Sequence, residues 1–320
     1  DELIAHTLLP RLENQTLNEL LDASVVPSTA GRMALTIDSY VVRPLSFPGG
    51  DIGRLAVSGT VNDLAVCGAE PLGLALSLIL AEGLERSTLE AMLDSIHSAA
   101  DEAGVPVITG DTKVVGRGQA DGMYITTAGV GSVPVNRRLH PDQIRPGDLI
   151  LVSGPIADHG LAVMLAREMP EVQSVIRSDV APLNRMIRSL LERVNDGVVF
   201  MRDPTRGGLA CVVTDIAVRS GLHVVLEENS IPIRPETRHA ADMLGLDPLE
   251  VANEGKVVIV VRPEAAETAL AALKNDPYGQ SASIIGHIDS TPDSICELQT
   301  IIGGRRILQK PYGEQLPRIC

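Results

Sequence analysis

Strand-like and helix-like patterns alternate along this chain, and that alternation constrains its fold more than any single motif does. Met33–Ile37 is rich in strand-forming residues, whereas residues 87–104 place apolar side chains at helical spacing between an STLE capping box and a terminal glycine. Further along, Leu149–Val152 predicts a strand and Asp158–Glu168 predicts a helix. A mixed order of this kind predicts an α/β or α+β protein.

The same alternation continues around these segments. Val105–Ile108 predicts a strand that ends at Asp111, and residues 209–216 predict a helix that ends near Gly221. Lys256–Val261 has the composition of a buried strand, and an alanine-rich helix is predicted to follow it.

Chain length favours two domains, because domains average roughly 150 residues and this chain has 320. The best candidate for the connection is 133–148, a polar and charged stretch with three prolines between two apolar segments. We therefore predict an N-terminal domain over residues 1–145, a C-terminal α/β domain over residues 146–308 and a flexible tail over residues 309–320.

Composition narrows the range of functions. The net charge is −14 and aromatic residues make up 2% of the chain, so the protein repels phosphate backbones and offers few rings for stacking on bases. The longest apolar run, Leu72–Ala81, is about half of the roughly 20 residues that span a bilayer. Four cysteines are too few for a disulfide scaffold. We expect a cytoplasmic protein that binds neither nucleic acid nor membrane.

Several familiar nucleotide and nucleophile motifs are missing, and aspartates stand out instead. The chain has no GxxxxGK[ST], GxGxxG or GxSxG motif. The aspartates at predicted strand ends and in glycine-containing turns are Asp22, Asp38, Asp63, Asp111 and Asp203. Taken singly, each is most simply a cap of a helix or turn. Taken together, they predict a magnesium site, because Mg²⁺ prefers hard oxygen ligands and shares them with substrate phosphates.

The segment DPTRGG, which begins at Asp203, suits a phosphate site. Gly207 and Gly208 have no side chains, so backbone N–H groups there can approach phosphate oxygens at a helix N-terminus, and Arg206 can add a bidentate contact. An ordinary glycine-rich turn between a strand and a helix explains the same residues equally well.

The chain ends in PYGEQLPRIC, with Cys320 as the last residue. Prolines disfavour a helix here, and ten extended residues reach roughly 33 Å. That reach allows the thiol to be loaded on another protein and to return to its own domain. A thiol of ordinary pKa is only about 3% thiolate at pH 7, so Cys320 needs a partner or an active-site cation to activate it. The alternative is an incidental cysteine at the end of a tail.

Six segments carry a resemblance to a known family. They are TIDSYVVRPLSFPGGDIG, GTVNDLAVCGAEP, ITGDTKVVGRG, RDPTRGGLA, VANEGKVV and the terminal LPRIC. With these segments, residues 22–320 resemble the HypE family of hydrogenase maturation factors, and the terminal PRIC is the most specific match. That family belongs to the superfamily of aminoimidazole ribonucleotide (AIR) synthetase, selenophosphate synthetase and thiamine-monophosphate kinase.

The resemblance implies an AIR-synthetase-like fold of two domains, in which the N-terminal domain binds ATP and joins its sheet to that of a second copy in a homodimer. It implies an ATP-dependent carbamoyl dehydratase that uses Mg²⁺. In that family the partner HypF places a carbamoyl group on the terminal cysteine, which is then dehydrated to a thiocyanate. The cyano group passes to iron held by HypC and HypD, as the cyanide ligand of [NiFe]-hydrogenase.

The resemblance also implies roles for particular residues. Cys320 would carry the carbamoyl group, Glu254 would take a proton from its nitrogen, and Lys113 would stabilise the developing negative charge. The metal would be held by Asp22, Asp38, Asp63 and Asp203, and the nucleotide would be contacted by Asn62, Asp63 and Asp111, with the turn of Arg206, Gly207 and Gly208 beside them. Without the resemblance, Glu254 is equally suited to a cap or a salt bridge, and Lys113 to a solvated strand end.

Three alternatives remain open at this point. A selenophosphate synthetase needs a cysteine or selenocysteine near its N-terminus, whereas the first cysteine here is Cys67. A small-molecule kinase needs no terminal thiol, and a docking scaffold needs no chemistry. For Cys67, Cys211 and Cys296 we expect packing roles, and for His159 a local hydrogen bond at a helix start. The family's glycine-rich segment that closes over ATP is not found ahead of Asp1, and a chain that begins there is expected to bind ATP weakly.

Overall fold

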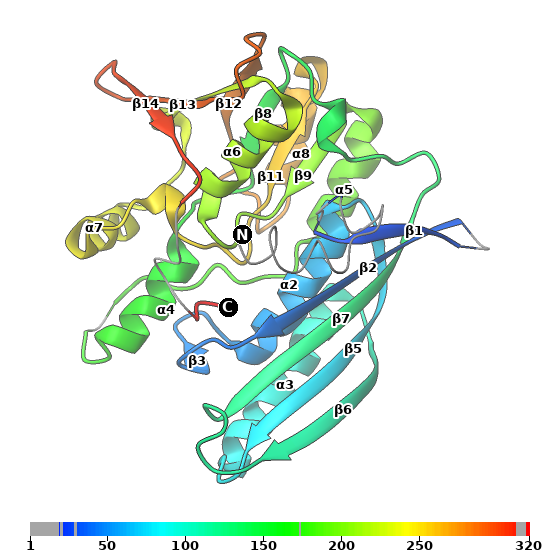
Figure 1. Cartoon of the computed structure of the whole chain (residues 1–320), viewed down its shortest axis with the longest axis vertical. Coiled ribbons are helices and arrows are strands. Elements are labelled where there is room, and N and C mark those ends of the chain that lie inside the picture. The colour runs from blue at the N-terminus through cyan, green and yellow to red at the C-terminus, as the bar shows by residue number, and fades with distance from the viewer. Residues whose placement is uncertain (1–18, 20–21, 29–30, 173, 312–317) are drawn as a thin grey trace.

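Two β-sheets organise the molecule. The computed structural model describes residues 19, 22–28, 31–172, 174–311 and 318–320. One sheet is built from residues 24–133 and the other from residues 149–308, with helices packed against each (Figure 1). Figure 1 shows the C-terminus between the two sheets. The predicted mixed class of helices and strands is confirmed.

The N-terminal sheet has five strands in the order β1-β2-β7-β5-β6, with β5 and β6 parallel and the other neighbours antiparallel. Its strands are β1 (Ser24–Ser28), β2 (Gly31–Tyr40), β5 (Glu70–Ala81), β6 (Val107–Val115) and β7 (Met123–Val133). One face is covered by the helices α2 (Ile52–Val66) and α3 (Arg86–Ala103), and a small hairpin leads into α2, formed by β3 (Ser46–Phe47) and β4 (Gly50–Asp51).

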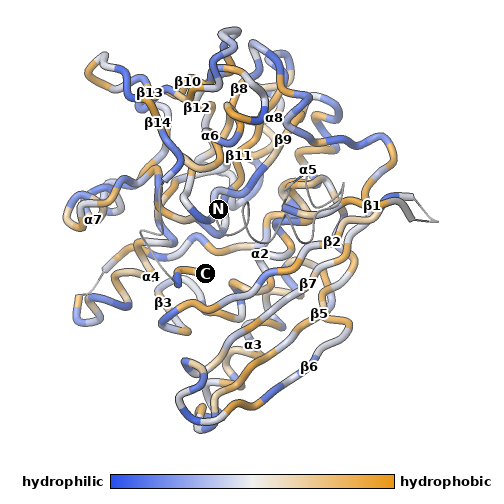
Figure 2. Tube along the Cα trace, in the orientation of Figure 1, coloured by the Kyte–Doolittle hydropathy of each residue, from blue (hydrophilic) through white to orange (hydrophobic). Residues whose placement is uncertain are grey.

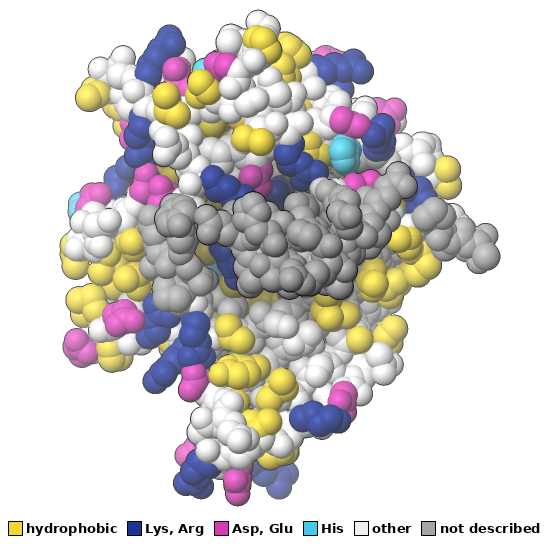
Figure 3. Space-filling model, in the orientation of Figure 1, with side chains coloured by type: hydrophobic (Ala, Val, Ile, Leu, Met, Phe, Trp, Pro, Cys, Tyr) yellow, Lys and Arg dark blue, Asp and Glu magenta, His cyan; other side chains and the backbone are white. Residues whose placement is uncertain are grey.

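Strand β2 shows that this sheet has one buried and one open face. Ala34 and Tyr40 are buried against the helices, whereas Leu35 and Ile37 between them are 56% and 68% exposed. The helices α2 and α3 cover one side, and among the described residues the apolar side chains of β2 on the other side are exposed in a single chain. Figure 3 shows hydrophobic side chains gathered over these strands.

The C-terminal sheet has seven strands in the order β14-β13-β10-β12-β8-β11-β9, and only the pair β10 and β13 is parallel. Its strands are β8 (Leu149–Val152), β9 (Val198–Arg202), β10 (His223–Glu227), β11 (Val258–Val261), β12 (Ser283–Asp289), β13 (Cys296–Gln299) and β14 (Arg305–Leu308). The helices of this half are α4 (Asp158–Glu168), α5 (Asn184–Val194), α6 (Gly208–Ser220), α7 (Pro235–Leu244) and α8 (Ala266–Lys274). Short 3-10 turns complete it: η3 (Pro141–Gln143), η4 (Asn195–Gly197), η5 (Glu228–Ser230), η6 (Pro248–Glu250) and η7 (Pro263–Ala265).

Strand β11 is apolar throughout because it is covered on both sides. Val258 and Val260 belong to a core formed with α6, whereas Ile259 and Val261 belong to a second core formed with α5 and α8. A strand with helices on both faces has no polar side, so its hydropathy is uniform and does not alternate. Figure 2 shows the hydrophobic colour of the strands at the centre of this sheet.

Most predicted elements match the observed ones. The boundaries of β8 and α4 are as predicted, and α6 ends just before Gly221. The capping-box prediction is wrong, because α3 begins at Arg86 with Glu85 at the N-cap, and Ser87 lies inside the helix. The predicted division near residue 145 lies between β7 and β8 and stays a prediction. Among the helices of the described ranges, none is long and apolar enough to cross a membrane.

Candidate active site

The four aspartates assigned to the metal come from different elements but interact with one another. Asp38 lies inside β2, Asp63 lies inside α2, Asp203 directly follows β9, and Asp22 lies just before β1. The expectation that these aspartates lie at strand ends or in glycine-containing turns is therefore wrong for Asp38 and Asp63. They meet because α2 packs on the inward face of β2 and also contacts β9 of the other sheet.

Threonine and arginine side chains hold these carboxylates. The contacts are Thr36 Oγ1 to Asp63 Oδ2 (2.9 Å), Thr60 Oγ1 to Asp38 Oδ2 (3.2 Å) and Arg202 Nε to Asp22 Oδ1 (3.1 Å). The charge of Arg202 is shared, because a second nitrogen of the same guanidinium lies 3.0 Å from Asp215 Oδ2. The carboxylates are thus oriented by neighbours that neutralise only part of their charge.

Burial and mutual repulsion raise the pKa of these carboxyl groups. The pKa of Asp63 is raised well above its usual range by burial and by the charges of Asp203, Asp38 and Asp22. Burial and the charge of Asp22 raise the pKa of Asp203 to about 7. The pKa values of Asp22 and Asp38 are also raised, mainly by burial. A divalent cation would relieve this repulsion, because it neutralises charge that the carboxylates cannot neutralise among themselves.

The protein ligands do not form a closed metal site by themselves. Within the described ranges, no group of three or more His, Cys, Asp or Glu side chains is arranged to hold a metal ion. The assignment of Mg²⁺ to the acidic cluster of Asp22, Asp38, Asp63 and Asp203 therefore stays a prediction, and it requires that a bound phosphate supply some of the oxygen ligands.

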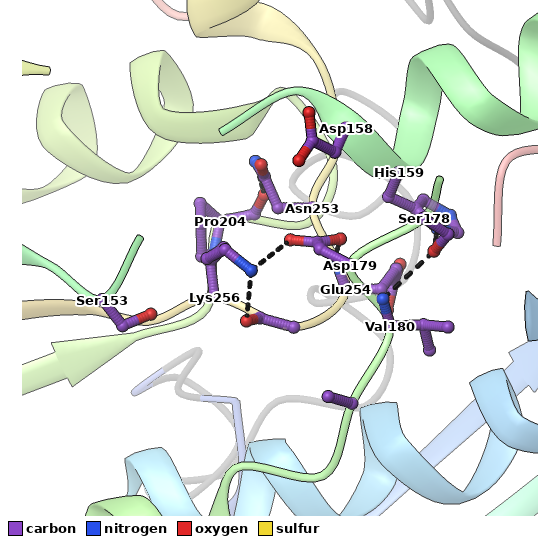
Figure 4. A network of polar contacts seen from close by, with 12 residues as sticks. Ser153, Asp158, His159, Ser178, Asp179, Val180, Pro204, Asn253, Glu254 and Lys256 are labelled. Atoms are coloured by element: carbon purple, nitrogen blue, oxygen red, sulfur yellow. Dashed lines mark hydrogen bonds and ion pairs between the residues drawn. The ribbon is translucent and has the colours of Figure 1, made fainter. Parts of the chain in front are cut away.

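Glu254 belongs to a second buried network, together with Asp179 and Lys256 (Figure 4). Its side chain is buried, and burial followed by the charges of Asp203, Asp179 and Asp38 raises its pKa well above the usual range. The backbone N–H of Glu254 donates to Asp179 Oδ1 over 3.1 Å, and Asp179 Oδ2 forms a 3.0 Å ion pair with Lys256 Nζ. Glu254 therefore interacts with both the acidic cluster and this second network, and its surroundings favour the protonated form of its carboxyl group.

The last three residues of the chain lie beside the second network, and the middle one is buried. The side chain of Ile319 is 3% exposed, and Ile319 O lies 3.1 Å from Nε2 of His159. The backbone N–H of Val41 donates to Cys320 O over 3.1 Å. Cys320 itself is partly buried and packs against a core to which α2, α3 and α4 all contribute. The predicted carrier residue is thus held between the two sheets.

Asn62 is buried and is bonded to the backbone of the other half of the chain. Its Nδ2 lies 3.0 Å from Ala181 O and 3.3 Å from Glu254 O, and its Oδ1 accepts a 2.7 Å hydrogen bond from Leu183 N–H. Asn62 therefore fastens α2 to the segments around Glu254. Its assignment to the nucleotide stays a prediction, beside this structural role.

The turn at Gly207 and Gly208 needs glycine for its own packing. Both residues have left-handed backbone, with φ of 74° and 58°. A Cβ at Gly208 would lie 2.5 Å from Val251 O, and one at Gly207 would lie 2.9 Å from Cys211 Cβ. Arg206 is exposed beside them. The simple turn is sufficient to explain both glycines, and phosphate binding by these three residues stays a prediction.

Asp111 and Lys113 lie apart from the acidic cluster in a single chain. Both are exposed on β6, the edge strand, and Lys113 Nζ lies 2.7 Å from Asp111 Oδ2. The hydrogen bond from Lys113 lowers the pKa of Asp111. The predicted strand end at Asp111 is wrong, because β6 pairs with β5 as far as Val115. Three strand spacings, or roughly 14 Å, separate β6 from β2.

Sequence reasoning does not identify Ser178, Asp179 or Lys256. Ser178 and Asp179 lie in a stretch without periodic pattern, so no local signal marks them. Lys256 could have been identified from the sequence, because a lysine directly before an apolar strand is expected to be buried and then needs a partner of opposite charge. The expected local hydrogen bond of His159 is wrong, because its two nitrogens contact Ser178 and Ile319, which are distant in sequence.

The fold and the site together define the class of the protein. Residues 21–133 match the family model of the AIR synthase related protein, N-terminal domain, and residues 145–299 match that of its C-terminal domain. The chain is a member of the AIR synthase related proteins, with the acidic cluster where its two halves meet.

Individual relatives narrow this class to one family. The chain is 47% identical over 319 residues to carbamoyl dehydratase HypE of Rhizobium leguminosarum bv. viciae, across 100% of this chain and 91% of that relative. A structure of a HypE–HypF complex has a TM-score of 0.91 at 40% identity, with 97% of this chain and 100% of that chain covered. A structure of HypE in complex with ATP has a TM-score of 0.86 at 42% identity, with 100% and 96% covered. The chain belongs to the carbamoyl dehydratase HypE family, which confirms the predicted resemblance.

Proposed function

We propose that this chain catalyses the ATP-dependent dehydration of a carbamoyl group carried on the sulfur of Cys320, so that the S-carboxamide becomes a thiocyanate. The observation that carries the proposal is the position of the last two residues, since Ile319 and Cys320 lie between the sheets beside the network that holds Glu254. A reacting group that is part of the chain needs no second encounter, and this removes much of the entropic cost of the reaction.

The proposed reaction takes place at one carbon atom. The carbamoyl oxygen attacks the γ-phosphorus of ATP, ADP leaves, and the phosphorylated group releases one N–H proton to solvent. Glu254 then removes the second N–H proton while the oxygen departs as phosphate, and a C≡N bond is left on the sulfur. Phosphorylation converts a poor leaving group into a good one, and a positioned carboxylate base contributes on the order of 10²–10⁴-fold.

Glu254 acts as a base only when its carboxyl group is ionised. Burial and the charges of Asp203, Asp179 and Asp38 raise its pKa in the ligand-free chain. Neutralising Asp203 and Asp38 lowers that pKa and so favours the ionised form. The acidic cluster would hold Mg²⁺ together with phosphate oxygens, and the ion supplies positive charge to the transferring phosphoryl group.

We further propose that two chains form a homodimer through the open faces of their N-terminal sheets. Leu35, Ile37 and Ile79 are exposed apolar side chains of that face. Lys113 lies on β6 of the same sheet, where a single chain leaves it exposed. A contact between two such faces would move Lys113 from solvent to the interface, and we propose that it then acts next to the site of the other chain.

The partners of the reaction follow from its chemistry. The thiol of Cys320 must first be loaded, and a HypE protein of this fold has been crystallised as a HypE–HypF complex. We therefore propose HypF as the donor of the carbamoyl group. The thiocyanate must then give up its cyano group to an acceptor, and we propose the HypC–HypD complex for that role.

Intact-mass spectrometry tests the reaction. The chain is loaded by HypF with carbamoyl phosphate and ATP, separated from nucleotide, and then given ATP with Mg²⁺. We expect a carbamoyl adduct at Cys320 that loses the mass of one water molecule only in the second step. Cys320→Ser should form no adduct, whereas Cys211→Ser should behave as the parent does. An adduct that Mg²⁺ and ATP never convert would contradict the enzymatic role and favour a docking scaffold.

A further inference from the structure

His159 is completely buried at the start of α4, and the proposed chemistry assigns it no role. Its Nε2 lies 3.1 Å from Ile319 O, and its Nδ1 lies 2.8 Å from Ser178 Oγ. The ring also packs edge-on against Phe47, with centroids 5.5 Å apart. A buried imidazole with both nitrogens bonded is held in one orientation. One of its two partners belongs to the terminal tripeptide Arg318–Cys320.

The partners of His159 determine which nitrogen carries the proton. A carbonyl oxygen only accepts, so Nε2 must be the donor to Ile319. The Ser178 hydroxyl oxygen accepts a 3.1 Å hydrogen bond from Val180 N–H, which leaves its own proton to be donated to Nδ1. The chain Val180–Ser178–His159–Ile319 is therefore satisfied by a single neutral tautomer. Figure 4 shows His159 and Ser178 facing each other beside Asp179.

The terminal tripeptide is held on its other side by the segment that follows β2. Val41 N–H donates to Cys320 O over 3.1 Å, and Arg43 N–H donates to Arg318 O over 3.4 Å. The Arg318 side chain returns a hydrogen bond of 3.1 Å from Nε to Val41 O and pairs with Asp121. The carbonyl of Arg318 and the terminal carboxylate of Cys320 thus face the Val41 side, and the carbonyl of Ile319 between them faces His159.

We propose that His159, oriented by Ser178, is a positioning residue that fixes the depth and register of the terminal tripeptide and so keeps Cys320 in the site between the two sheets. Loss of the Nε2 donor leaves Ile319 O buried without its partner, which disfavours the docked tail. The catalytic consequence rests on the proposed function, because only there does the docked position matter for turnover. The proposal that His159 holds the terminal tripeptide in place does not depend on the proposed function.

Alkylation of the terminal thiol measures docking directly. The full chain is treated with iodoacetamide, and labelling of each cysteine is followed by peptide mass spectrometry. We expect His159→Leu to raise the alkylation rate of Cys320 about tenfold, which corresponds to about 1.4 kcal/mol. His159→Gln should retain most of the protection, because its amide N–H can still donate to Ile319 O. Cys296 is buried, so its protection in the same sample reports that the fold is intact.

The outcomes separate docking from a general structural role. An unchanged Cys320 rate in His159→Leu, with Cys296 still protected, would overturn the proposal. If His159→Leu exposes Cys296 as well, Ser178→Ala decides the matter. That variant should raise the Cys320 rate by about threefold, because Nδ1 loses the donor that selects the tautomer, and an unchanged rate there would also overturn the proposal.

A second readout distinguishes this proposal from the proposed function. In chains already loaded with a carbamoyl group, His159→Leu should slow the loss of water about tenfold, while loading by HypF is as fast as in the parent or faster. If the parent never loses water, the proposed function is wrong and the alkylation result still stands. If His159→Leu loses water at the parent rate although its Cys320 is more reactive, the positioning role is wrong and the proposed function is unaffected.

Discussion

Asp179 Oδ2 and Lys256 Nζ lie 3.0 Å apart, and the two side chains are only 5% and 8% exposed. Burial alone would raise the pKa of Asp179, but the charge of Lys256 and the hydrogen bond from the backbone N–H of Glu254 hold it below its usual value. The same carboxylate accepts the backbone N–H of Glu254. The ion pair therefore sets the position of the proposed base, and it links that base to the residue that holds the tail.

Removing one partner of this pair should be costly. Lys256→Met leaves Asp179 as a buried charge without its cation, and we expect a loss of about 3–5 kcal/mol in the free energy of unfolding, measured in urea. The double variant with Asp179→Asn should recover part of the loss. Arg86→Met, which breaks an exposed ion pair with Glu90, is the control and should cost less than about 1 kcal/mol. A Lys256→Met protein as stable as that control would contradict the prediction.

Glu254→Gln tests the proposed base. Glutamine has the same shape but cannot take a proton, so we expect dehydration of the loaded carbamoyl group to slow by about 10²–10⁴-fold, while loading is unchanged. Single-turnover mass spectrometry measures both steps. Glu236→Gln changes an exposed glutamate of α7 and should react as the parent does. Dehydration at the normal rate in Glu254→Gln would remove this residue from the mechanism.

The stability that depends on His159 should vary with pH. Burial lowers the pKa of His159 although the charge of Asp179 opposes the shift. The unfolded chain then binds the proton more readily than the folded one, so stability is full above the unfolded pKa of about 6.5 and is lost as the pH falls below it. Urea unfolding at pH 7.5 and 5.5 should show that the parent loses more stability than His159→Gln does. A difference between the two proteins that stays constant with pH would contradict this expectation.

The buried cysteines should be inert. Burial, with a smaller contribution from Glu297, raises the pKa of Cys296 to about 12, so at pH 9 only about one thiol in a thousand is ionised. Burial raises the pKa of Cys67 as well. In folded protein at pH 9, iodoacetamide should label Cys320 well before either residue, and urea should abolish the difference. Labelling of Cys296 as fast as Cys320 in folded protein would show that the thiol is accessible.

A single charged substitution tests whether the open face of the N-terminal sheet forms the dimer contact. Ile37→Asp places a carboxylate on the face that is proposed to pair, and we expect the molar mass from light scattering to fall from that of two chains to that of one. Met243→Asp is the matched control, because Met243 is 74% exposed on α7 of the other half, while Ile37 is 68% exposed. A parent protein that is already monomeric, or an Ile37→Asp protein that stays dimeric, would contradict the dimer through this face.

Sequence patterns predicted elements well where one local signal decides them. The boundaries of α4 and β8 follow from periodicity and burial, and both are as predicted. The boundary of β6 could not be found in this way, because pairing with β5 extends the strand through Gly110 and Asp111, which locally favour a turn. The acidic cluster was predicted from residue types, whereas its location in the interior of β2 and α2 follows from how the helix packs on the sheet.

The sequence by itself determined the mixed class, the family and the terminal thiol, because these reside in residue order and in short segments. Tertiary structure alone decided that Ile319 lies against His159, 160 positions away, and that Asp179 supports Glu254, 75 positions away. It also separated Lys113 from the acidic cluster of its own chain by the width of a sheet. Local patterns report which face of an element is buried, but they carry no information about which distant element covers it, and that choice creates the site.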